Sequence, residues 1–242
     1  MHSYAIISDV HANLEALQAV LEKIENDNID KILFLGDSVG YGPDPNECTD
    51  ILKQKAAIMV AGNHDWAATG QTDTAYFNPY AKTAIEWTNR VLTDPVVKHI
   101  QSLPVTERLI EDNIFLVHAT PREPEKWHYL SYKHNASENF KYFEESICFL
   151  GHSHIPFVVE LSHGGELGVH YTQVAVREGN RYIVNVGSVG QPRDGNPDVT
   201  YVLLKNKMIK IKRVSYDILL TQKKMRRAGM PSYLVERLSK GR

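Results

Sequence analysis

Five short apolar runs of this 242-residue sequence each end in side chains that can bind metals or transfer protons. The runs are Tyr4–Ser8, Ile32–Leu35, Ala57–Ala61, Ile114–Val117 and Ile147–Leu150. In the same order, they are followed by Asp9-Val10-His11, Gly36-Asp37, Gly62-Asn63-His64-Asp65, His118 and Gly151-His152-Ser153-His154. Carboxylate oxygens and imidazole nitrogens are common ligands of transition metals. The pattern therefore predicts a metal-dependent active site.

The placement of the histidines favours this interpretation over a purely structural one. Taken singly, Gly36-Asp37 is typical of a turn, and a histidine after a strand is usually a hydrogen-bonded core residue. However, five of the eleven histidines follow these apolar runs, and the other six are scattered. A structural explanation would need the same coincidence at every run, so the combination indicates an active site.

The apolar runs are predicted to be buried, parallel strands, because continuous apolar runs of this length are typical of strands covered on both faces. Between the first two runs, Leu14–Asn26 has the spacing of an amphipathic helix, and Asn13 is a suitable N-cap. A second helix is expected around Asn46–Gln54. Where strands and helices alternate along the chain, successive strands pair in parallel and the helices form right-handed crossovers between them. Active sites in such sheets form at the carboxyl ends of the strands.

The second half of the chain is predicted to be rich in strands and to end in two helices. Strands are expected at Phe157–Leu161, Tyr171–Arg177, Tyr182–Val186, Val199–Leu204 and Met208–Val214. Helices are expected at Ile218–Arg227 and Ser232–Leu238. The segment from Trp66 to Leu103 reads as helical and overhangs the site in this interpretation. We therefore expect a single domain over residues 1–242 with a helical cap inserted at about 66–103.

Composition disfavours several classes of protein. The net charge of −2 shows no basic excess of the kind that nucleic-acid binders carry, and two basic runs near the C-terminus are interpreted as solvated surface. Two cysteines do not form a disulfide scaffold. We find no signal-peptide pattern and no apolar segment of the ~18–20 residues that a membrane span requires. We expect a cytoplasmic protein with a small-molecule partner and no membrane contact, and the oligomeric state stays open.

The ordered motifs resemble those of the calcineurin-like metallophosphoesterase superfamily. All five blocks occur in order between residues 9 and 154. The later stretch Asn185-Val186-Gly187-Ser188-Val189-Gly190-Gln191-Pro192-Arg193 looks like a loop of a bacterial and archaeal subgroup. That subgroup is similar to small phosphodiesterases and diadenosine-tetraphosphate hydrolases. The resemblance implies an α/β (α+β) fold, a four-layer αββα sandwich of two mixed β-sheets flanked by helices.

The resemblance also implies two divalent metal ions. One ion would be bound by Asp9, His11, Asp37 and His154. The other would be bound by Asp37, Asn63, His118 and His152. Asp37 would then bridge the two ions. Nitrogen and oxygen ligands without a thiolate suit Mn, Fe or Zn better than Ca, while Mg or Ni is also possible.

The implied reaction is hydrolysis of a phosphoester bond by a hydroxide that the two ions share. His64 resembles the histidine of the family that is not a ligand, and it is the expected general acid for the leaving group. Alternatively, His64 is a structural residue that contacts the metal ligands without binding a metal itself. Asp65 is expected to hold the tautomer of the His64 ring and to favour its charged form.

The substrate is less well defined by the sequence. Tyr41 stands where protein phosphatases of the superfamily carry an arginine, and Arg193 is either a substitute for that charge or a surface residue. Aromatic residues of the cap could stack on a base or simply pack it; they are Trp66, Tyr76, Phe77, Tyr80 and Trp87. The sequence favours a phosphodiesterase or a nucleotide or dinucleoside-polyphosphate hydrolase. A phosphomonoesterase or protein phosphatase, and a non-catalytic metal-binding scaffold, remain alternatives.

Overall fold

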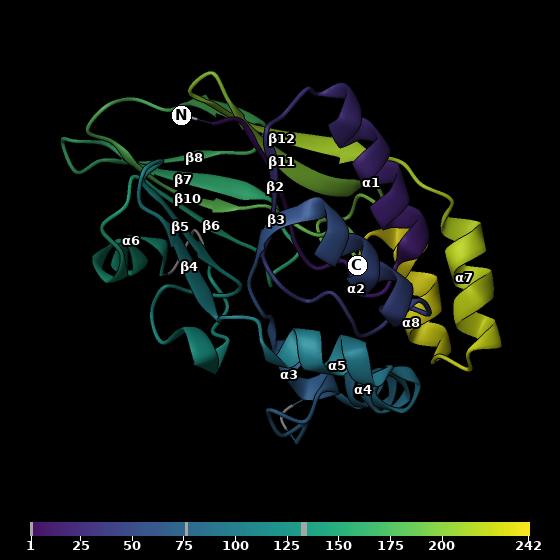
Figure 1. Cartoon of the computed structure of the whole chain (residues 1–242). Coiled ribbons are helices and arrows are strands. Elements are labelled where there is room, and N and C mark those ends of the chain that lie inside the picture. The colour runs from purple at the N-terminus through teal and green to yellow at the C-terminus, as the bar shows by residue number, and fades with distance from the viewer. Residues whose placement is uncertain (1, 76, 132–134) are drawn as a thin grey trace.

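Two mixed, six-stranded β-sheets packed face to face form the centre of the protein, as the computed structural model shows for residues 2–75, 77–131 and 135–242 (Figure 1). The first sheet has the order β3-β2-β1-β11-β12-β9 and the second the order β4-β5-β6-β10-β7-β8. The strands of the first sheet are β1 (Tyr4–Ile7), β2 (Lys31–Phe34), β3 (Ala56–Met59), β9 (Gln173–Ala175), β11 (Val199–Lys205) and β12 (Met208–Val214). Those of the second are β4 (Thr106–Leu109), β5 (Ile114–Val117), β6 (Ile147–Leu150), β7 (Phe157–Leu161), β8 (Leu167–His170) and β10 (Arg181–Asn185).

Helices cover the outer faces of both sheets and the edge where the site forms (Figure 1). In the described residues the α-helices are α1 (Leu14–Asn26), α2 (Pro45–Lys55), α3 (Asn63–Ala68), α4 (Pro79–Val91), α5 (Asp94–Gln101), α6 (Ala136–Asn139), α7 (Ile218–Arg227) and α8 (Ser232–Arg237). Asn13 caps α1 as predicted, because its side-chain oxygen accepts a hydrogen bond from the Ala16 N–H at 3.2 Å. Within the described chain, we find no helix with the length and apolarity of a bilayer-crossing segment.

Alternating side chains explain the four layers. In β1, Tyr4 and Ile6 join the core between the two sheets, while Ala5 and Ile7 face α1 and α2. In β6, Phe149 belongs to the same central core. The neighbouring residues of β6 pack against the cluster on the outer face of the second sheet, beside α6. The predicted sandwich of two mixed sheets flanked by helices is therefore confirmed.

Parallel pairing is found where the sequence predicts it. β1 pairs in parallel with β2, and β2 with β3, with α1 and α2 as the crossovers. In the second sheet, β5 pairs in parallel with β6, and β6 with β10. The carboxyl ends of these strands therefore point to one edge of the sandwich, where the polar segments of the sequence begin.

Two edge strands are absent from the sequence prediction. The prediction lacked β4 and β8, and the strand expected at Tyr171–Arg177 is the shorter β9. β4 and β8 lie at the two edges of the second sheet and have no fully buried residue. A strand that is exposed on its edge and on one face does not need a continuous apolar run, so its pattern is weak.

The central core predicts a clear stability effect. Leu33 is fully buried between the sheets, so Leu33→Ala is expected to lower the free energy of unfolding by about 2–5 kcal/mol. Ile110→Ala is the matched control, because Ile110 is 75% exposed and should change stability by less than about 0.5 kcal/mol. Denaturant unfolding with a chelator present measures both. Equal stability of the two variants would contradict this packing.

Candidate active site

The backbone leaves the strands abruptly where the predicted ligands begin. Five of the seven predicted ligands adopt left-handed conformations; their φ angles are +53° at Asp9, +47° at His11, +59° at Asp37, +64° at His152 and +60° at His154. Such conformations cost about 1–3 kcal/mol each in non-glycine residues and persist only where the surroundings enforce them. Backbone hydrogen bonds provide that enforcement between the first two loops, from Asp9 to Gly36 and from His11 to Asp37, both at 3.0 Å. Strain concentrated in this way is typical of functional sites.

One group of converging side chains consists of Asp9, His11 and His154, all buried, with potential ligand atoms within 4.8 Å of one another. The Nε2 atoms of the two histidines are 3.1 Å apart, and His154 Nε2 is 3.1 Å from Asp9 Oδ1. A backbone carbonyl orients each ring through its other nitrogen. Nδ1 of His11 donates to the Val39 carbonyl at 3.0 Å, and Nδ1 of His154 donates to the Gln191 carbonyl at 2.6 Å. These bonds leave both Nε2 lone pairs free to bind a cation.

A second group consists of Asp37, His118 and His152. His118 Nε2 lies 3.3 Å from Asp37 Oδ2, 3.2 Å from His152 Nδ1 and 3.2 Å from Asn63 Oδ1. Nδ1 of His118 donates to the Leu35 carbonyl at 2.7 Å. The Oδ2 atom of Asp37 is also 3.7 Å from His11 Nε2, so this carboxylate lies between the two groups.

The side chains fit divalent cations better than they fit one another. The Nε2 atoms of His11 and His154 face each other at 3.1 Å. Both are lone-pair acceptors when the rings are neutral, because each Nδ1 donates to a backbone carbonyl. Asp9 Oδ1 and His152 Nε2 are buried and have no hydrogen-bond partner. Buried polar atoms without partners are costly and need an explanation. Cations bound among these nitrogen and oxygen atoms would provide one.

Charge inside the site is balanced by a proton on one histidine. Burial would lower the pKa of His118, but Asp37 and Asp9 raise it to about 9. The same pairing holds the pKa of both carboxyl groups below its usual range, against the effect of burial. Burial lowers the pKa of His152 and of His154 to about 3, with help from His118 and Arg193 respectively. Without metal, the site therefore contains two carboxylates, an imidazolium at His118 and neutral imidazoles at His152 and His154.

His64 lies beside both groups. Its backbone N–H donates to Asp37 Oδ1 at 2.8 Å, and its ring packs against the rings of His11 and Tyr41, with centroids 4.8 and 4.5 Å away. Its Nδ1 atom is buried without a partner. Burial lowers the pKa of His64 well below its usual value; Asp37 opposes this effect, and His11 and Arg193 add to it. The His64 ring is therefore neutral at neutral pH in the metal-free protein.

Asp65 does not hold the His64 ring, so the predicted contact is wrong. Its Oδ2 accepts hydrogen bonds from the backbone N–H groups of Asp37 at 2.8 Å and Gly62 at 3.0 Å. Its Oδ1 accepts from the backbone and hydroxyl of Ser38, at 2.9 and 2.7 Å. Asp65 is the third residue of α3, where a carboxylate reaches back to the free N–H groups that precede a helix. Its role is to fix the loop that carries Asp37.

Tyr41 and Arg193 lie together next to the first group, which favours the first of the two alternatives for Arg193. The Tyr41 ring is 4.7 Å from the His11 ring, and its hydroxyl is 3.5 Å from Nη2 of Arg193. Nη2 also donates to Gln191 Oε1 at 3.0 Å, and the backbone N–H of Arg193 donates to the His154 carbonyl at 3.2 Å. The loop that follows β10 therefore places a cation beside the candidate metal ligands.

A cavity of about 320 Å³ lies beside the two groups and is lined by His152 of the second group. Tyr41, Asn63 and His64 also line it. The cap forms one wall with Thr72, Asp73, Phe77, Asn78 and Ala81, and the opposite wall is formed by Lys126, Trp127 and Tyr129. Tyr129 stacks on the His152 ring at 4.2 Å. The sequence interpretation missed Lys126, Trp127 and Tyr129 because no apolar periodicity or ligand motif marks that segment.

The predicted cap aromatics have different roles. Phe77 lines the cavity and packs edge-on against His64, with ring centroids 5.1 Å apart. Trp66 packs edge-on against Trp127 at 5.2 Å, so it supports the opposite wall. Tyr80 stacks on Tyr233 of α8 at 4.8 Å, away from the ligands. The remaining two are Trp87, which packs against the apolar cluster around Tyr41, and Tyr76, which lies outside the described residues.

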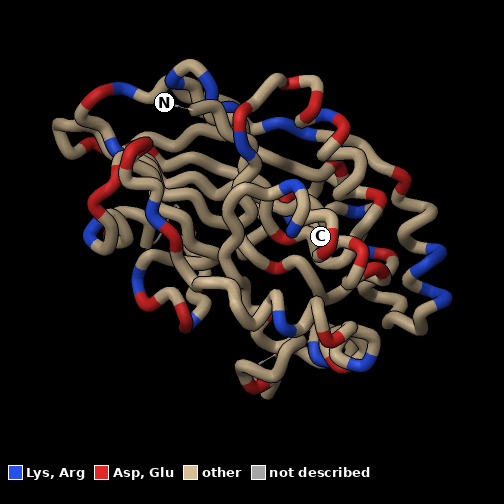
Figure 2. Tube along the Cα trace, viewed as in Figure 1, with Lys and Arg blue, Asp and Glu red and all other residues tan. Residues whose placement is uncertain are grey.

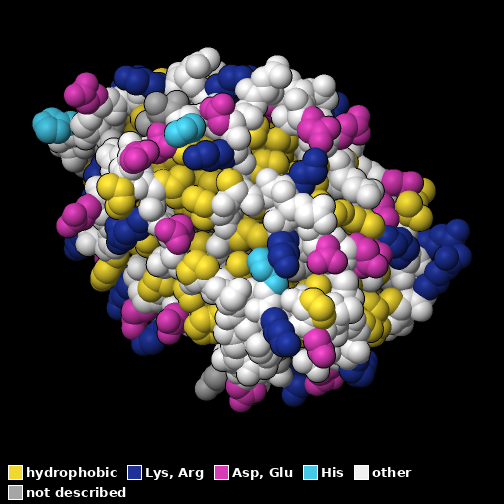
Figure 3. All heavy atoms as spheres, viewed as in Figure 1, with side chains coloured by type: hydrophobic (Ala, Val, Ile, Leu, Met, Phe, Trp, Pro, Cys, Tyr) yellow, Lys and Arg dark blue, Asp and Glu magenta, His cyan; other side chains and the backbone are white. Residues whose placement is uncertain are grey.

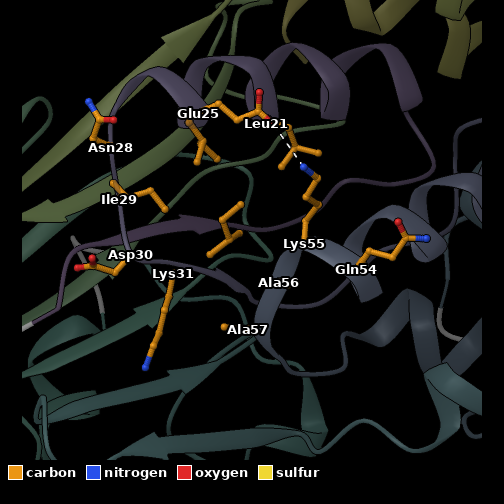
Figure 4. Close-up of a pocket in the computed structure, with 12 residues that line it drawn as sticks. Leu21, Glu25, Asn28, Ile29, Asp30, Lys31, Gln54, Lys55, Ala56 and Ala57 are labelled. Atoms are coloured by element: carbon orange, nitrogen blue, oxygen red, sulfur yellow. Dashed lines mark hydrogen bonds and ion pairs between the residues drawn. The ribbon is translucent and has the colours of Figure 1, made fainter.

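A larger cavity lies at the other end of the first sheet and lacks such ligands. It measures about 450 Å³ and is lined by the amino-terminal ends of β2 and β3 and the carboxyl-terminal ends of α1 and α2. Figure 4 shows Lys31 pointing away from Lys55, which pairs with Glu25 at 3.3 Å. Its size does not make it the better candidate site, because it contains no histidine and no buried carboxylate.

Comparisons with known proteins show which family the chain belongs to. A profile of the calcineurin-like phosphoesterase superfamily domain matches residues 3–208. An uncharacterized protein of Methanocaldococcus jannaschii is 42% identical over 245 residues, with 98% of each chain covered. A crystal structure of a metallophosphoesterase from Sphaerobacter thermophilus is 39% identical, with a TM-score of 0.86, and the match covers 100% of this chain and 99% of that one. A hypothetical protein from Pyrococcus horikoshii shares the fold at 19% identity, with a TM-score of 0.79 and the same coverage.

The proton on His118 predicts a pH dependence of metal binding. Its pKa is about 9, so the ring is protonated at neutral pH in the metal-free protein, whereas a metal ion binds only neutral imidazole. The Mn²⁺ affinity, measured by calorimetry, should therefore rise about tenfold per pH unit from about pH 6.5 to 8.5, and binding should release a proton. His118→Asn should remove this slope. A wild-type affinity that is flat over this range would contradict the assignment.

Proposed function

The chain belongs to the calcineurin-like phosphoesterase superfamily and is a metal-dependent hydrolase of phosphoric esters; we propose that it uses two metal ions to cleave small phosphodiesters, nucleotides among them. The observation that carries the proposal is the position of Asp37. Its Oδ2 atom lies 3.3 Å from Nε2 of His118 and 3.7 Å from Nε2 of His11, and these two rings belong to different ligand groups. A carboxylate in this position suits the bridge of a dinuclear site.

The seven predicted ligands divide into two sets around that bridge. Asp9, His11 and His154 would hold one ion together with Asp37. His118, His152 and Asn63 would hold the other. Two bound cations would supply a water of lowered pKa as nucleophile and would neutralise the charge of the phosphate ester. Nitrogen and oxygen donors without thiolate favour Mn, Fe or Zn.

The protein residues around the metal ligands have separate tasks. Asp65 fixes the backbone of Asp37 and Ser38 and so keeps the bridging carboxylate in place. The carbonyl groups of Val39 and Gln191 orient the rings of His11 and His154. Arg193, beside Tyr41, supplies positive charge to a phosphate that enters the cavity. This arrangement leaves little for the ligands to reorganise when a substrate binds.

A small substrate suits the cavity and the surface better than a nucleic acid does. The volume of about 320 Å³ is at the lower end of the range of small-molecule sites. Figures 2 and 3 show lysine and arginine interspersed with aspartate and glutamate over the visible face, without a continuous basic groove. Basic residues near the C-terminus are partly paired: Lys212 with Asp27 at 3.8 Å, and Lys224 with Glu15 at 2.7 Å. Tyr129, which is 60% exposed, offers a ring against which a nucleobase can stack.

His64 assists the leaving oxygen as a neutral donor. Its lowered pKa disfavours an imidazolium at neutral pH, so the charged general acid expected from the sequence needs this revision. A neutral imidazole still donates one N–H hydrogen bond. His64 lines the cavity, so its ring is available to the oxygen that carries the developing negative charge.

Hydrolysis of defined esters tests the proposed function. With Mn²⁺ present, the wild-type protein should cleave bis-nitrophenyl phosphate and dinucleoside polyphosphates faster than nitrophenyl phosphate. Asp37→Asn should lose at least about 100-fold in metal affinity at both sites, together with activity. The matched control is Asp112→Asn, which changes a buried carboxylate bonded to Tyr4 at the far end of β1.

Three results of that experiment would contradict the proposal. Faster cleavage of the monoester would indicate a phosphomonoesterase. Metal binding without cleavage of any ester would indicate a scaffold. Two metals bound to Asp37→Asn with wild-type affinity would exclude Asp37 as the bridge.

The role of His64 is tested by comparing two substitutions. His64→Ala should keep both metals and lose about 10²–10⁴ in turnover, with the larger loss on alkyl esters, whose leaving groups are poor. His64→Gln should recover part of the loss, because a glutamine amide also donates a neutral hydrogen bond. Equal losses on nitrophenyl and alkyl esters would show that His64 does not act on the leaving oxygen. A glutamine variant as poor as the alanine variant would favour proton transfer over neutral donation.

A further inference from the structure

Helix α7 lies beyond the residues that match the family profile, yet its side chains bond to segments of the first ligand group. The profile ends at residue 208, whereas α7 covers Ile218–Arg227. The helix, yellow in Figure 1, packs beside the start of α1, and α1 follows the turn that carries Asp9 and His11. The contacts of α7 with this region are made by two polar side chains, one helical turn apart.

Thr221 connects α7 to the N-cap of α1. It is fully buried, and its hydroxyl lies 2.8 Å from Glu15 Oε2 and 3.1 Å from Asn13 Oδ1. The hydroxyl has one proton, so it donates to one of these two oxygens at a time. The Asn13 amide in turn donates to the Gly190 carbonyl at 2.9 Å. Asn13 is therefore held between α7 and the loop that follows β10.

The turn at Gly190 and Gln191 extends this contact to two ligands of the first group. The backbone N–H of Gly190 donates to the Asp9 carbonyl at 2.8 Å, and the Gln191 carbonyl accepts from Nδ1 of His154 at 2.6 Å. A Cβ atom at Gly190 would lie 1.9 Å from the Val10 carbonyl oxygen. The turn is therefore packed as tightly as a glycine allows against the segment that follows β1.

Lys224 connects α7 to a third segment. Its Nζ atom lies 2.7 Å from Glu15 Oε1 and also forms an ion pair with Asp44. The side chain of Lys224 is 25% exposed, and those of its two partners are 10% and 14% exposed, so solvent screens these pairs less than it screens surface pairs. The backbone N–H of Asp44 donates to the Ala12 carbonyl at 3.1 Å. Lys224 therefore ties the loop after β2 to the turn after β1.

The same helix lies directly behind the ring-bearing turn of the first group. A cavity between them measures about 10 Å³, which leaves room for at most one water molecule. Its lining includes His11, Asn13, Gln191, Thr221 and Met225. Among the described residues, no hydrogen bond or ion pair of an α7 side chain reaches Asn63, His118 or His152. The contacts of α7 are therefore confined to the side of the first group.

Three segments that carry or orient the first group thus converge on two side chains of α7. Contacts that hold metal ligands in place from outside are typically worth about 10–100-fold in metal affinity. We propose that Thr221 and Lys224 are positioning residues that preorganise the metal site of the first group and leave the site of the second group unaffected. The proposal rests on the proposed function for the presence of two metal ions. It gives α7, outside the matched family domain, control over the occupancy of one metal site.

Metal binding by α7 variants tests the proposal without requiring turnover. Mn²⁺ is titrated by calorimetry into the metal-free protein. Thr221→Val keeps the shape of the side chain and removes the hydroxyl, and Lys224→Met removes the charge. Each should weaken one of the two Mn²⁺ sites about 10–100-fold and leave the other at wild-type affinity. Thr221→Ser and Lys224→Arg should recover part of the lost affinity.

Two backgrounds identify the site that responds. His152→Ala removes a ligand of the second group, and there Thr221→Val should still weaken the remaining Mn²⁺ site. His154→Ala removes a ligand of the first group, and there Thr221→Val should leave the remaining site unchanged. The opposite pattern would assign α7 to the second group and overturn the proposal.

Thr88→Val and Lys55→Met are the matched controls. Thr88 is also fully buried in a helix, and its hydroxyl donates to the Ala84 carbonyl of its own helix at 2.9 Å. Lys55 also pairs with a glutamate, Glu25, at 3.3 Å, at the opposite end of the first sheet. Both controls should bind two Mn²⁺ ions like the wild type.

Three results would overturn the proposal. They are equal losses at both sites, equal losses in Thr221→Val and Thr88→Val, and two wild-type Mn²⁺ affinities in Thr221→Val with only a lower melting temperature. In the last case α7 would stabilise the fold without positioning the ligands. Failure of the proposed function is distinguishable, because the wild type would then bind two ions without cleaving any ester while the variants still lost one site.

Discussion

The buried carboxylate of Asp37 is the group on which the rest of the site depends. Its Oδ1 accepts the backbone N–H of His64 at 2.8 Å, and its Oδ2 faces one histidine of each ligand group. The backbone N–H of Asp37 donates to Asp65 Oδ2 at 2.8 Å. Gly62 has to be a glycine, since a Cβ atom there would lie 2.1 Å from Asp37 Oδ1. The loops after β2 and β3 are thus locked together around one carboxylate, and neither can move without the other.

A second buried carboxylate, that of Asp9, joins the two sheets in the same way. The backbone N–H of His152, from the loop after β6, donates to Asp9 Oδ2 at 2.9 Å, and Asp9 follows β1 of the other sheet. At Gly151, a Cβ atom would lie 2.3 Å from that same oxygen. Neither ligand group is complete until the sandwich has closed, because each takes residues from both sheets. Metal binding should therefore stabilise the closed sandwich, and the left-handed conformations of the ligands are strain that sheet packing sustains.

Features that recur at the end of each strand could be predicted from the sequence, whereas contacts that depend on a single loop or helix end could not. Strand after strand ends in a ligand-type residue, so the seven predicted ligands could be found and the structure brings them together. Asp65 was misassigned because its adjacency to His64 suggested a contact, whereas helix geometry turns its side chain back onto Asp37. The wall formed by Trp127 and Tyr129 depends on an irregular loop that folds over His152. Only the tertiary structure reveals such a contact, since no periodicity marks it.

The residues suited to bind metal and the residues suited to select a substrate lie in different segments of the chain. The rings of His11, His118 and His154 are each held by a hydrogen bond to a backbone carbonyl, which leaves little freedom for variation. Around Tyr41, by contrast, side chains of the cap helix α4, the Arg193 loop and α8 meet. The phenol of Tyr41 lies beside His11, and the positive charge next to it comes from Arg193, on the loop that follows β10. Changes in those segments can alter which phosphate ester binds while the ligand geometry, and hence the hydrolytic chemistry, stays the same.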